Sequence, residues 1–334
     1  MITVYGGGSW GTALAHVLAS AGREVSLLLR DEAVAAVVNE RHENPRYLPG
    51  LPLAPSLRAV TDSSVLGASD VWVLAVPCQN QRGALEAART LLRPETVIVN
   101  AAKGIELDTL KPLSVVTREA LGGTEEDVRC RYAMLSGPSF AREVVENKPS
   151  AVVLGCAEET LGARLRAMFA TPWFRCYSSP DVRGVELGGA VKNVIAIAAG
   201  VCDGLRFGDN ARAALVTRGL AEITRLGVAM GARASTFMGL SGLGDLMLTC
   251  TGDLSRNRQV GLRLGEGERL DDIAADMHMV AEGVKTTRAV DGLARKLNVE
   301  MPITSVMNAL LDGRLAPQQA VELLMRRSLK EESA

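Results

Sequence analysis

The stretch "ITVYGGGSWGTALAHVLASAG", residues 2–22, predicts the fold of the first half of the chain. Gly6, Gly8 and Gly11 have the spacing G-x-G-x-x-G, after an apolar run typical of a strand and at the start of an apolar-faced stretch typical of a helix. In a β-α-β unit these glycines permit a tight turn, the approach of a pyrophosphate to the backbone and close helix–strand packing. The stretch therefore predicts a dinucleotide-binding domain; the alternative is a glycine-rich turn without a ligand.

Short apolar runs recur through the first half, with helical patterns such as 11–21 and 83–92 between several of them. The runs expected to form strands are 2–5, 25–29, 71–76, 97–101, 132–135, 151–154 and 174–177. Most are continuously apolar, as in a parallel sheet that is covered on both faces. The expected fold class is α/β, with a doubly wound, Rossmann-type N-terminal domain.

Strand patterns stop near "SSP", residues 178–180, and helical patterns follow. Helices are expected at 183–201, 210–230, 255–264, 283–297 and 317–327. We therefore expect a Rossmann-type domain over residues 1–180 and an all-α domain over residues 181–334.

Composition narrows the class of protein. The net charge of −1 favours neither nucleic acid nor an anionic membrane surface. The six cysteines form no C-x-x-C pair and there are only three histidines, so no metal site is expected. No signal peptide and no membrane-spanning run is evident, and the cysteines read as free thiols of a reducing compartment. These features predict a cytoplasmic protein.

The second expected strand ends in "LLLRD", which bears on the choice of cofactor. An acidic residue at this point typically accepts hydrogen bonds from the ribose hydroxyls of NAD, whereas an arginine suits the 2′-phosphate of NADP. Arg30 precedes Asp31 here, so NADP is favoured, with NAD also open. The alternative is a surface arginine followed by an aspartate that caps a helix.

The stretch "LGGAVKNVIAIAAGVCDG", residues 187–204, predicts a helix that is apolar on every side, yet it contains Lys192 and Asn193. Burying an unpaired ammonium costs several kcal/mol, so Lys192 must be paired or lose its proton. Its helical neighbours include Gly188 and Gly189, which predicts open space beside it or the approach of a helix or ligand. Lys192 could be a general base of depressed pKa, or a structural lysine in an ion pair.

Two polar features follow in "GLGDLMLTCTGDLSRNR", residues 242–258. Asp245 and Thr249 are four residues apart, so they share a helix face, and Asp245 could pair with Lys192. Ser255 stands where it could cap a helix that begins at Arg256. An arginine beside N-terminal amides suits a phosphate, although an exposed basic turn is the alternative.

Polar residues also follow two expected strands, where ligands bind in doubly wound sheets. Lys103 stands in "VNAAKGIE", and Gly137, Ser139 and Ala141 stand in "MLSGPSFA". Lys103 could instead be an ordinary solvated lysine of a loop.

Together, GGGSWGTALA, AAKGIE, LSGPSFA, ELGGAVKNVIAIAAG, GLGDLMLTCTGDLSRNR and VAEGVKT resemble the bacterial NAD(P)-dependent glycerol-3-phosphate dehydrogenases, from residue 1 to about residue 315. The resemblance implies a Rossmann domain joined to a helical substrate and dimerisation domain, and a homodimer. The implied reaction is the reversible reduction of dihydroxyacetone phosphate to sn-glycerol 3-phosphate with NADPH or NADH, which supplies glycerophospholipid synthesis.

The resemblance also implies roles for individual residues. The expected catalytic residues are Lys192, the proton donor and acceptor, with Lys103, Asp245 and Thr249. The expected cofactor contacts are Gly6, Gly8, Ser9, Trp10, Gly11, Arg30, Lys103, Ala141, Arg256, Val280 and Glu282. The expected substrate contacts are Lys103, Gly137, Ser139, Lys192, Asn193, Asp245, Ser255, Arg256 and Asn257. Two alternatives stay open: another two-domain dehydrogenase of the 3-hydroxyacid or 6-phosphogluconate type, and an NADP-sensing protein without catalysis.

Overall fold

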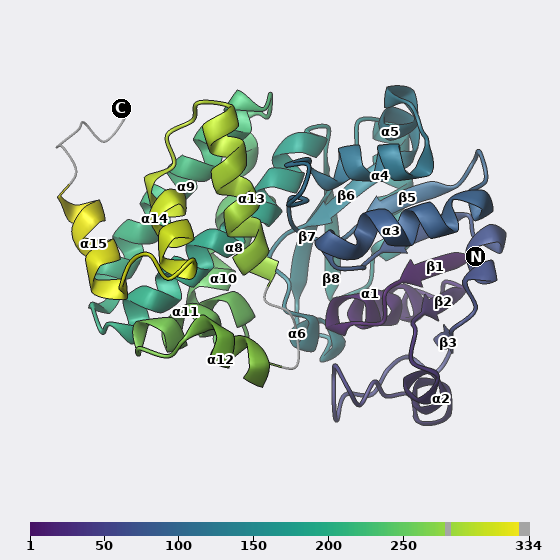
Figure 1. Ribbon diagram of the computed structural model, residues 1–334. Coiled ribbons are helices and arrows are strands. Elements are labelled where there is room, and N and C mark those ends of the chain that lie inside the picture. Colours follow the sequence, from purple (N-terminus) through teal and green to yellow (C-terminus); the bar gives the residue numbers. More distant parts are fainter. Residues whose placement is uncertain (278–281, 327–334) are drawn as a thin grey trace.

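The computed structural model describes residues 1–277 and 282–326. The chain forms two halves that lie side by side (Figure 1). One half contains every strand of the described residues and the helices between them, and it ends with the strand Phe174–Ser179. The other half consists of helices, and it begins with a long helix directly after Pro180.

One sheet of eight strands runs through the first half. The strands are β1 (Ile2–Tyr5), β2 (Val25–Leu28), β3 (Arg58–Val60), β4 (Val71–Leu74), β5 (Val97–Asn100), β6 (Tyr132–Ser136), β7 (Ser150–Gly155) and β8 (Phe174–Ser179). Their order is β3-β2-β1-β4-β5-β6-β7-β8. In the parallel register of the centre, Ile2 lies opposite both Val25 and Val71. This order, which reverses beside β1, is that of a doubly wound sheet and confirms the predicted α/β class.

The parallel direction expected from the apolar runs does not hold at one edge of the sheet. β7 runs antiparallel to β6, and β8 runs parallel to β7, so these two strands oppose the other six. β3 was also missing from the expected strands, because it has only three residues and begins with the exposed Arg58. A strand this short at an edge carries no apolar run that a sequence pattern could reveal.

Helices join the strands and form the second half. In the first half they are α1 (Ser9–Ser20), α2 (Glu32–Arg41), η1 (Ser63–Ala68), α3 (Cys78–Ala88), η2 (Arg89–Leu91), α4 (Leu113–Leu121), α5 (Glu125–Arg131), α6 (Ala141–Val145) and α7 (Glu159–Phe169). In the second half they are α8 (Val182–Gly204), α9 (Gly208–Ala229), η3 (Ala234–Met238), η4 (Leu240–Gly244), α10 (Asp245–Thr251), α11 (Arg256–Gly265), α12 (Leu270–Asp276), α13 (Glu282–Lys296), α14 (Pro302–Leu311) and α15 (Pro317–Met325). Each helix expected from the sequence is present, most with shifted ends, and α3 begins five residues earlier than expected. α15 begins at Pro317 as expected, and the expected end of that helix at residue 327 lies outside the described residues.

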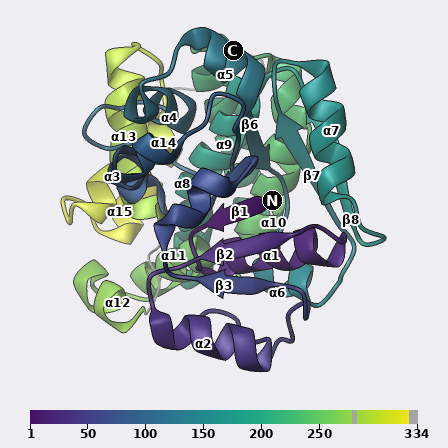
Figure 2. The ribbon, with the colours of Figure 1, turned by 90° about the vertical axis from the view of Figure 1, so that its right-hand side faces the viewer.

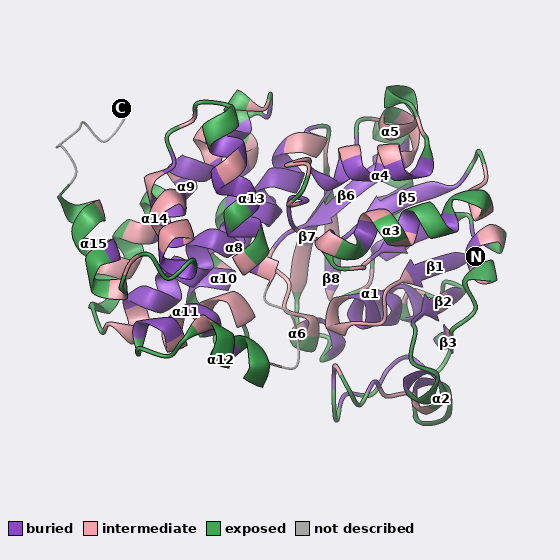
Figure 3. Cartoon of the chain, viewed as in Figure 1, coloured by how far each residue is buried: buried purple, intermediate pink, exposed green. Residues whose placement is uncertain are grey.

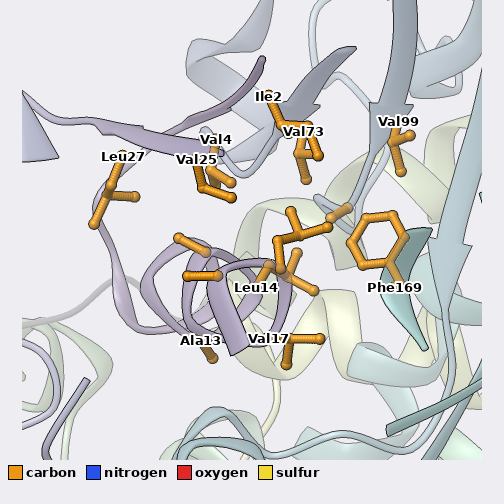
Figure 4. Close-up of a cluster of buried hydrophobic side chains, with 14 of the residues drawn as sticks. Ile2, Val4, Ala13, Leu14, Val17, Val25, Leu27, Val73, Val99 and Phe169 are labelled. Atoms are coloured by element: carbon orange, nitrogen blue, oxygen red, sulfur yellow. The ribbon is translucent and has the colours of Figure 1, made fainter. Parts of the chain in front are cut away.

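Helices cover both faces of the sheet, which explains why its strands are continuously apolar. Figure 2 shows α3 and α4 on one side of the strands and α7 on the other. Alternate residues of β4 serve the two faces: Val73 joins the cluster with α1 and α7, and Trp72 joins the cluster with α3 and α4. In Figure 4, Leu14 and Val17 of α1 lie beneath the valines of the central strands.

The second half is built around α8, which lies at its centre and is buried along nearly its whole length (Figures 1 and 3). Helices α9, α10, α11, α13 and α14 pack on it, and it also contacts β6 and β7 of the sheet. Asp181 caps its first turn by accepting from the Gly184 amide at 2.9 Å. By length and composition α8 could cross a membrane, but its most apolar window is wholly buried inside the protein, as in a core helix.

Candidate active site

The glycine-rich turn joins β1 to α1. Gly6 has φ of +122°, and a Cβ on Gly11 would lie 1.9 Å from the Gly6 carbonyl oxygen, so both positions require glycine. A Cβ on Gly8 would meet nothing within 4 Å, so the backbone there is open to a ligand. No side chain caps α1, and its first turn contains no acidic residue. The amides at this helix N-terminus therefore suit a pyrophosphate, as the sequence predicted.

The segment after α2 packs on this turn, a contact that the sequence did not predict. Asn44, which is fully buried, donates to the Gly7 carbonyl oxygen at 3.1 Å. Ser9 Oγ donates to the Tyr47 carbonyl oxygen at 3.2 Å. Trp10, the other cofactor contact expected here, has a buried Nε1 without an acceptor among the described residues. In the sequence, Asn44 is one asparagine in an irregular segment, and such a residue does not indicate which group it will bind.

Arg30 and Asp31 both lie exposed just beyond β2. Asp31 caps α2 by accepting from the Val34 amide at 3.2 Å, which was the structural alternative for that residue. Its other carboxylate oxygen lies 3.3 Å from Arg46 Nη1. Asp31 is thus occupied by the helix cap and by Arg46, and the exposed Arg30 beside it in the sequence is the residue type that suits a 2′-phosphate.

Lys192 lies with two polar side chains of α10. Its amine donates to Asp245 Oδ1, and it donates to Thr249 Oγ1 at 2.7 Å. The Thr249 hydroxyl donates in turn to the Asp245 carbonyl oxygen at 2.6 Å. Only 5% of Lys192 and 1% of Asp245 are exposed, so this is a buried ion pair. The partnership of Lys192 with Asp245 that the sequence suggested is therefore present.

Lys103 reaches the same carboxylate from the sheet. It follows β5, and its Nζ lies 2.6 Å from Asp245 Oδ2 and 3.3 Å from the Gly137 carbonyl oxygen. Ser139 Oγ donates to that same Gly137 oxygen at 3.0 Å. Lys103, Gly137 and Ser139, three of the residues expected after the two strands, thus lie together with Asp245 of α10.

One carboxylate therefore faces two amines in a buried place. Burial is the main cause that lowers the pKa of Lys192, to about 7; the Asp245 charge opposes this shift, and the Lys103 charge adds to it. For Asp245, burial acts to raise the pKa, but the charges and hydrogen bonds of Lys103 and Lys192 outweigh it, and the pKa lies below its usual value. Lys192 is the less exposed amine, at 7% of its side chain against 16% for Lys103. Lys192 can therefore exchange a proton near neutral pH.

The small neighbours of Lys192 do not leave open space, which corrects that expectation. A Cβ on Gly188 would lie 2.6 Å from the Ser241 carbonyl oxygen, and one on Gly189 would lie 2.5 Å from Ser136 Oγ. The glycines instead let η4 and the end of β6 come close to α8, because the Ser241 backbone and the Ser136 side chain fill the room that larger side chains on α8 would take. Asn193 is buried beside Lys192, with 5% exposed.

The "SRNR" segment begins α11. Ser255 accepts from the Arg258 amide at 3.2 Å and so caps the helix as expected. Asn257 Oδ1 accepts from the Gly283 amide at 3.0 Å, so this expected substrate contact also ties α11 to α13. Burial lowers the pKa of Arg256 from its usual value, and the charge of Glu282 opposes that shift. Arg256 is thus a partly buried cation, suited to an anionic group.

Glu282 joins the two halves of the chain. Its carboxylate accepts from the Cys78 amide, at the start of α3, at 2.9 Å. Burial raises the pKa of Glu282, and the charges of Arg256 and Lys103 oppose that shift. Ala141 is the first residue of α6. Val280, the remaining expected cofactor contact, lies outside the described residues.

The candidate site thus combines a glycine-rich turn whose amides suit a phosphate, a partly buried arginine and a buried amine that can exchange a proton. In the described part of the chain, no group of histidine, cysteine, aspartate and glutamate could hold a metal ion. This is chemistry for moving a proton beside a bound nucleotide, with a separate anchor for an anion.

Comparison with known proteins shows to which family of nucleotide-dependent enzymes the chain is similar. Residues 1–162 match the family model described as the N-terminus of NAD-dependent glycerol-3-phosphate dehydrogenase, and residues 181–322 match the model of its C-terminus. The chain is 60% identical over 332 residues to a glycerol-3-phosphate dehydrogenase [NAD(P)+] of Nitratidesulfovibrio vulgaris (strain DP4), covering 99% of both chains.

A relative of the same name from Geobacter sulfurreducens is 50% identical, over 99% of this chain and 98% of the relative. The crystal structure of a glycerol-3-phosphate dehydrogenase from Coxiella burnetii is similar with a TM-score of 0.92 and 39% identity, over 98% of each chain. The chain therefore belongs to the family of NAD(P)-dependent glycerol-3-phosphate dehydrogenases.

Proposed function

We propose that this chain reversibly reduces dihydroxyacetone phosphate to sn-glycerol 3-phosphate with NADPH or NADH, and that Lys192 donates and accepts the proton. The observation that carries the proposal is the buried cluster in which Lys192 and Lys103 share the carboxylate of Asp245. Membership of the family supports the substrate, the cofactor and the reaction.

The glycine-rich turn would hold the pyrophosphate of the cofactor, and Arg30 would attract a 2′-phosphate. The uncapped N-terminus of α1 and the open backbone at Gly8 fit this role. When bound, the nicotinamide supplies or accepts the hydride at C2 of the substrate.

Lys192 would handle the proton of the C2 oxygen. In oxidation its neutral amine takes the hydroxyl proton, and in reduction its ammonium gives a proton to the carbonyl oxygen. Asp245 and Thr249 fix the direction of the amine, since both are hydrogen-bonded to it. Lys103 adds positive charge where negative charge develops on the oxygen.

Arg256, Ser255 and Asn257 would hold the phosphate of the substrate at the start of α11. The partly buried guanidinium and the N-terminal amides of α11 make this place favourable for a dianion. Binding energy from the phosphate would then align C2 with the amine of Lys192. Gly137 and Ser139, which lie beside Lys103, and Asn193, which follows Lys192 in α8, would contact the rest of the substrate.

Assembly and location are further parts of the proposal. We expect a homodimer in the cytoplasm, with the helical residues 181–334 contributing substrate binding and dimerisation and residues 1–180 contributing cofactor binding. Light scattering on the purified protein should give twice the mass of one chain. Fractionation of the source cells should recover the enzyme with the soluble contents.

Steady-state kinetics test the proposed reaction. The purified protein should oxidise NADPH or NADH when dihydroxyacetone phosphate is added, and the ratio of kcat/KM for the two cofactors reports the contribution of Arg30. A panel with 3-hydroxyacids and 6-phosphogluconate should give at most a trace of turnover. Preference for a member of that panel would favour a different dehydrogenase. Tight NADPH binding without turnover on any substrate would favour a sensing protein.

A further inference from the structure

The segment that carries Lys103 has little regular structure of its own. Residues 101–112 between β5 and α4 form one isolated bridge, Ile105 with Pro112. Lys103 stands near the start of this segment and reaches Asp245 with its amine. The position of that amine therefore depends on what holds the segment.

The first turn of α3 holds it. Gln79, the second residue of α3, donates from Nε2 to the Ile105 carbonyl oxygen at 2.8 Å. Its Oε1 accepts from the Leu107 amide at 2.9 Å. One side-chain amide thus satisfies a backbone acceptor and a backbone donor two residues apart, as a neighbouring strand would.

The packing beside this clamp is tight. Gly104, with φ of +157°, lies so close to α3 that a Cβ on it would be 2.8 Å from Cys78 Cβ and Sγ. Arg82, one turn after Gln79, binds Glu106 through Nε at 2.8 Å and Nη2 at 2.7 Å. Gln79 is central in this row of contacts, because among the described residues its side chain is the one that binds main-chain atoms on both sides of Glu106.

We propose that Gln79 is a positioning residue of the reaction: by clamping Ile105 and Leu107 it fixes where the Lys103 amine stands relative to Lys192 and Asp245. The inference rests on the proposed function of Lys192. It assigns no contact with substrate or cofactor to Gln79.

If Gln79 had only a structural role, replacing it would leave the pKa of Lys192 unchanged. The pKa of Lys192 therefore distinguishes a positioning role of Gln79 from a purely structural one. Among residues 1–277 and 282–326, the titratable groups found to act on or with the Lys192 amine are Asp245 and Cys250 on α10 and Lys103 beyond β5. The positive charge of Lys103 contributes to the lowered pKa of Lys192. If the Lys103 amine moves away, the pKa of Lys192 must rise, and oxidation, which needs the neutral amine, must shift to higher pH.

The test is Gln79→Met in the full-length enzyme, which keeps the size of the side chain and removes both hydrogen bonds. Asn39→Leu is a matched control, because Asn39 clamps the Ala59 amide and carbonyl in the same way, at 2.9 Å each, on the edge strand β3. We expect Gln79→Met to lower kcat for oxidation of sn-glycerol 3-phosphate about tenfold to hundredfold. We expect its pH profile to move to higher pH, and Asn39→Leu to change neither.

A double-mutant cycle shows whether Gln79 acts through Lys103. In a Lys103→Met background, Gln79→Met should change kcat by no more than about twofold and leave the pH profile in place. The same loss with and without Lys103, or a lowered melting temperature with an unchanged pH profile, would overturn the inference. Wild-type turnover that survives Lys192→Ala would instead overturn the proposed function, so the two failures are distinguishable.

Discussion

The amines of Lys103 and Lys192 bind the two oxygens of a single buried carboxylate, although one lysine follows a strand of the sheet and the other lies in the central helix of the second half. The carboxylate, Asp245, can balance only one of the two positive charges. Lys192 is buried, and its burial together with the Lys103 charge lowers its pKa to about 7. A lysine whose burial would otherwise destabilise the fold can therefore exchange a proton near neutral pH.

Removing the negative charge of Asp245 should shift the pKa of Lys192 in a defined direction. Asp245→Asn leaves two amines facing each other without a carboxylate, so the pKa of Lys192 should fall further, since the Asp245 charge now raises it. The pH profile of oxidation should shift to lower pH, while kcat falls about a hundredfold because the amine loses its orientation. A profile that moves to higher pH would contradict this account of the cluster. The direction is opposite to that expected for Gln79→Met.

Arg256→Ala tests the phosphate site. We expect the KM for dihydroxyacetone phosphate to rise about tenfold to hundredfold, as for the loss of a charged hydrogen bond, with a far smaller effect on the affinity for NADPH. Arg258→Ala is the control on the same helix, because Arg258 is bound to Asp203 at 2.8 Å and Asp253 at 2.9 Å. It should lower the melting temperature and leave KM unchanged. An unchanged KM in Arg256→Ala would remove this residue from the phosphate site.

Two glycines of the turn should respond differently to the same substitution. Gly11→Ala places a methyl group against the Gly6 carbonyl and should destabilise the protein without ligand by about 1–3 kcal/mol. Gly8→Ala meets open space at φ of −73°, so the melting temperature of the protein without ligand should stay the same. Its affinity for NADPH, measured by calorimetry, should nevertheless fall, because the methyl group obstructs the pyrophosphate. Equal losses of stability in both variants would argue against this reading of the turn.

Glu222 predicts a pH dependence of stability that is separate from catalysis. This buried residue of α9 accepts from the Ile303 and Thr304 amides at the start of α14, and burial raises its pKa from 4.5 to about 7. The folded protein therefore holds a proton that the unfolded chain loses above about 4.5, so stability from this group is full below pH 4.5 and is lost as the pH rises through 7.

The matching variant is Glu222→Gln, which keeps the size of the side chain but cannot ionise. We expect its free energy of unfolding, measured in urea, to increase relative to that of the wild type as the pH rises from 5 to 8. The expected increase is on the order of 1 to 3 kcal/mol. A difference that stays constant over this range would show that Glu222 does not titrate there.

Much of the fold was predictable because its strands and helices are long or strongly apolar. The strands β1, β4 and β5 are buried on both faces and stand out as continuous apolar runs. The reversed direction of β7 was not predictable, since a run such as "SAVVLG" is the same in either direction. α14 was missed although Pro302 marks its start, because its short apolar pattern resembles a strand as much as a helix.

The candidate site was predictable residue by residue but not as an arrangement. The sequence singled out Lys192 by its apolar surroundings and Asp245 by its spacing from Thr249. It gave no sign that Lys103, 142 residues before Asp245, reaches the same carboxylate. Gln79 and Asn44 escaped notice because they act on backbone atoms, and a side-chain amide that binds backbone leaves no pattern of residue types. The domain boundary near residue 180 and the role of each site residue stay predictions.

The most direct test of the account is the turnover of Lys192→Ala, measured with saturating dihydroxyacetone phosphate and NADPH and compared with its dissociation constant for NADPH. We expect kcat to fall by about 10²–10⁴, the usual contribution of a general acid or base, and NADPH to bind within about threefold of the wild type. Added methylamine should restore part of the rate, because a small amine can take the place of the missing one. Turnover near that of the wild type would contradict the assignment of the proton to Lys192.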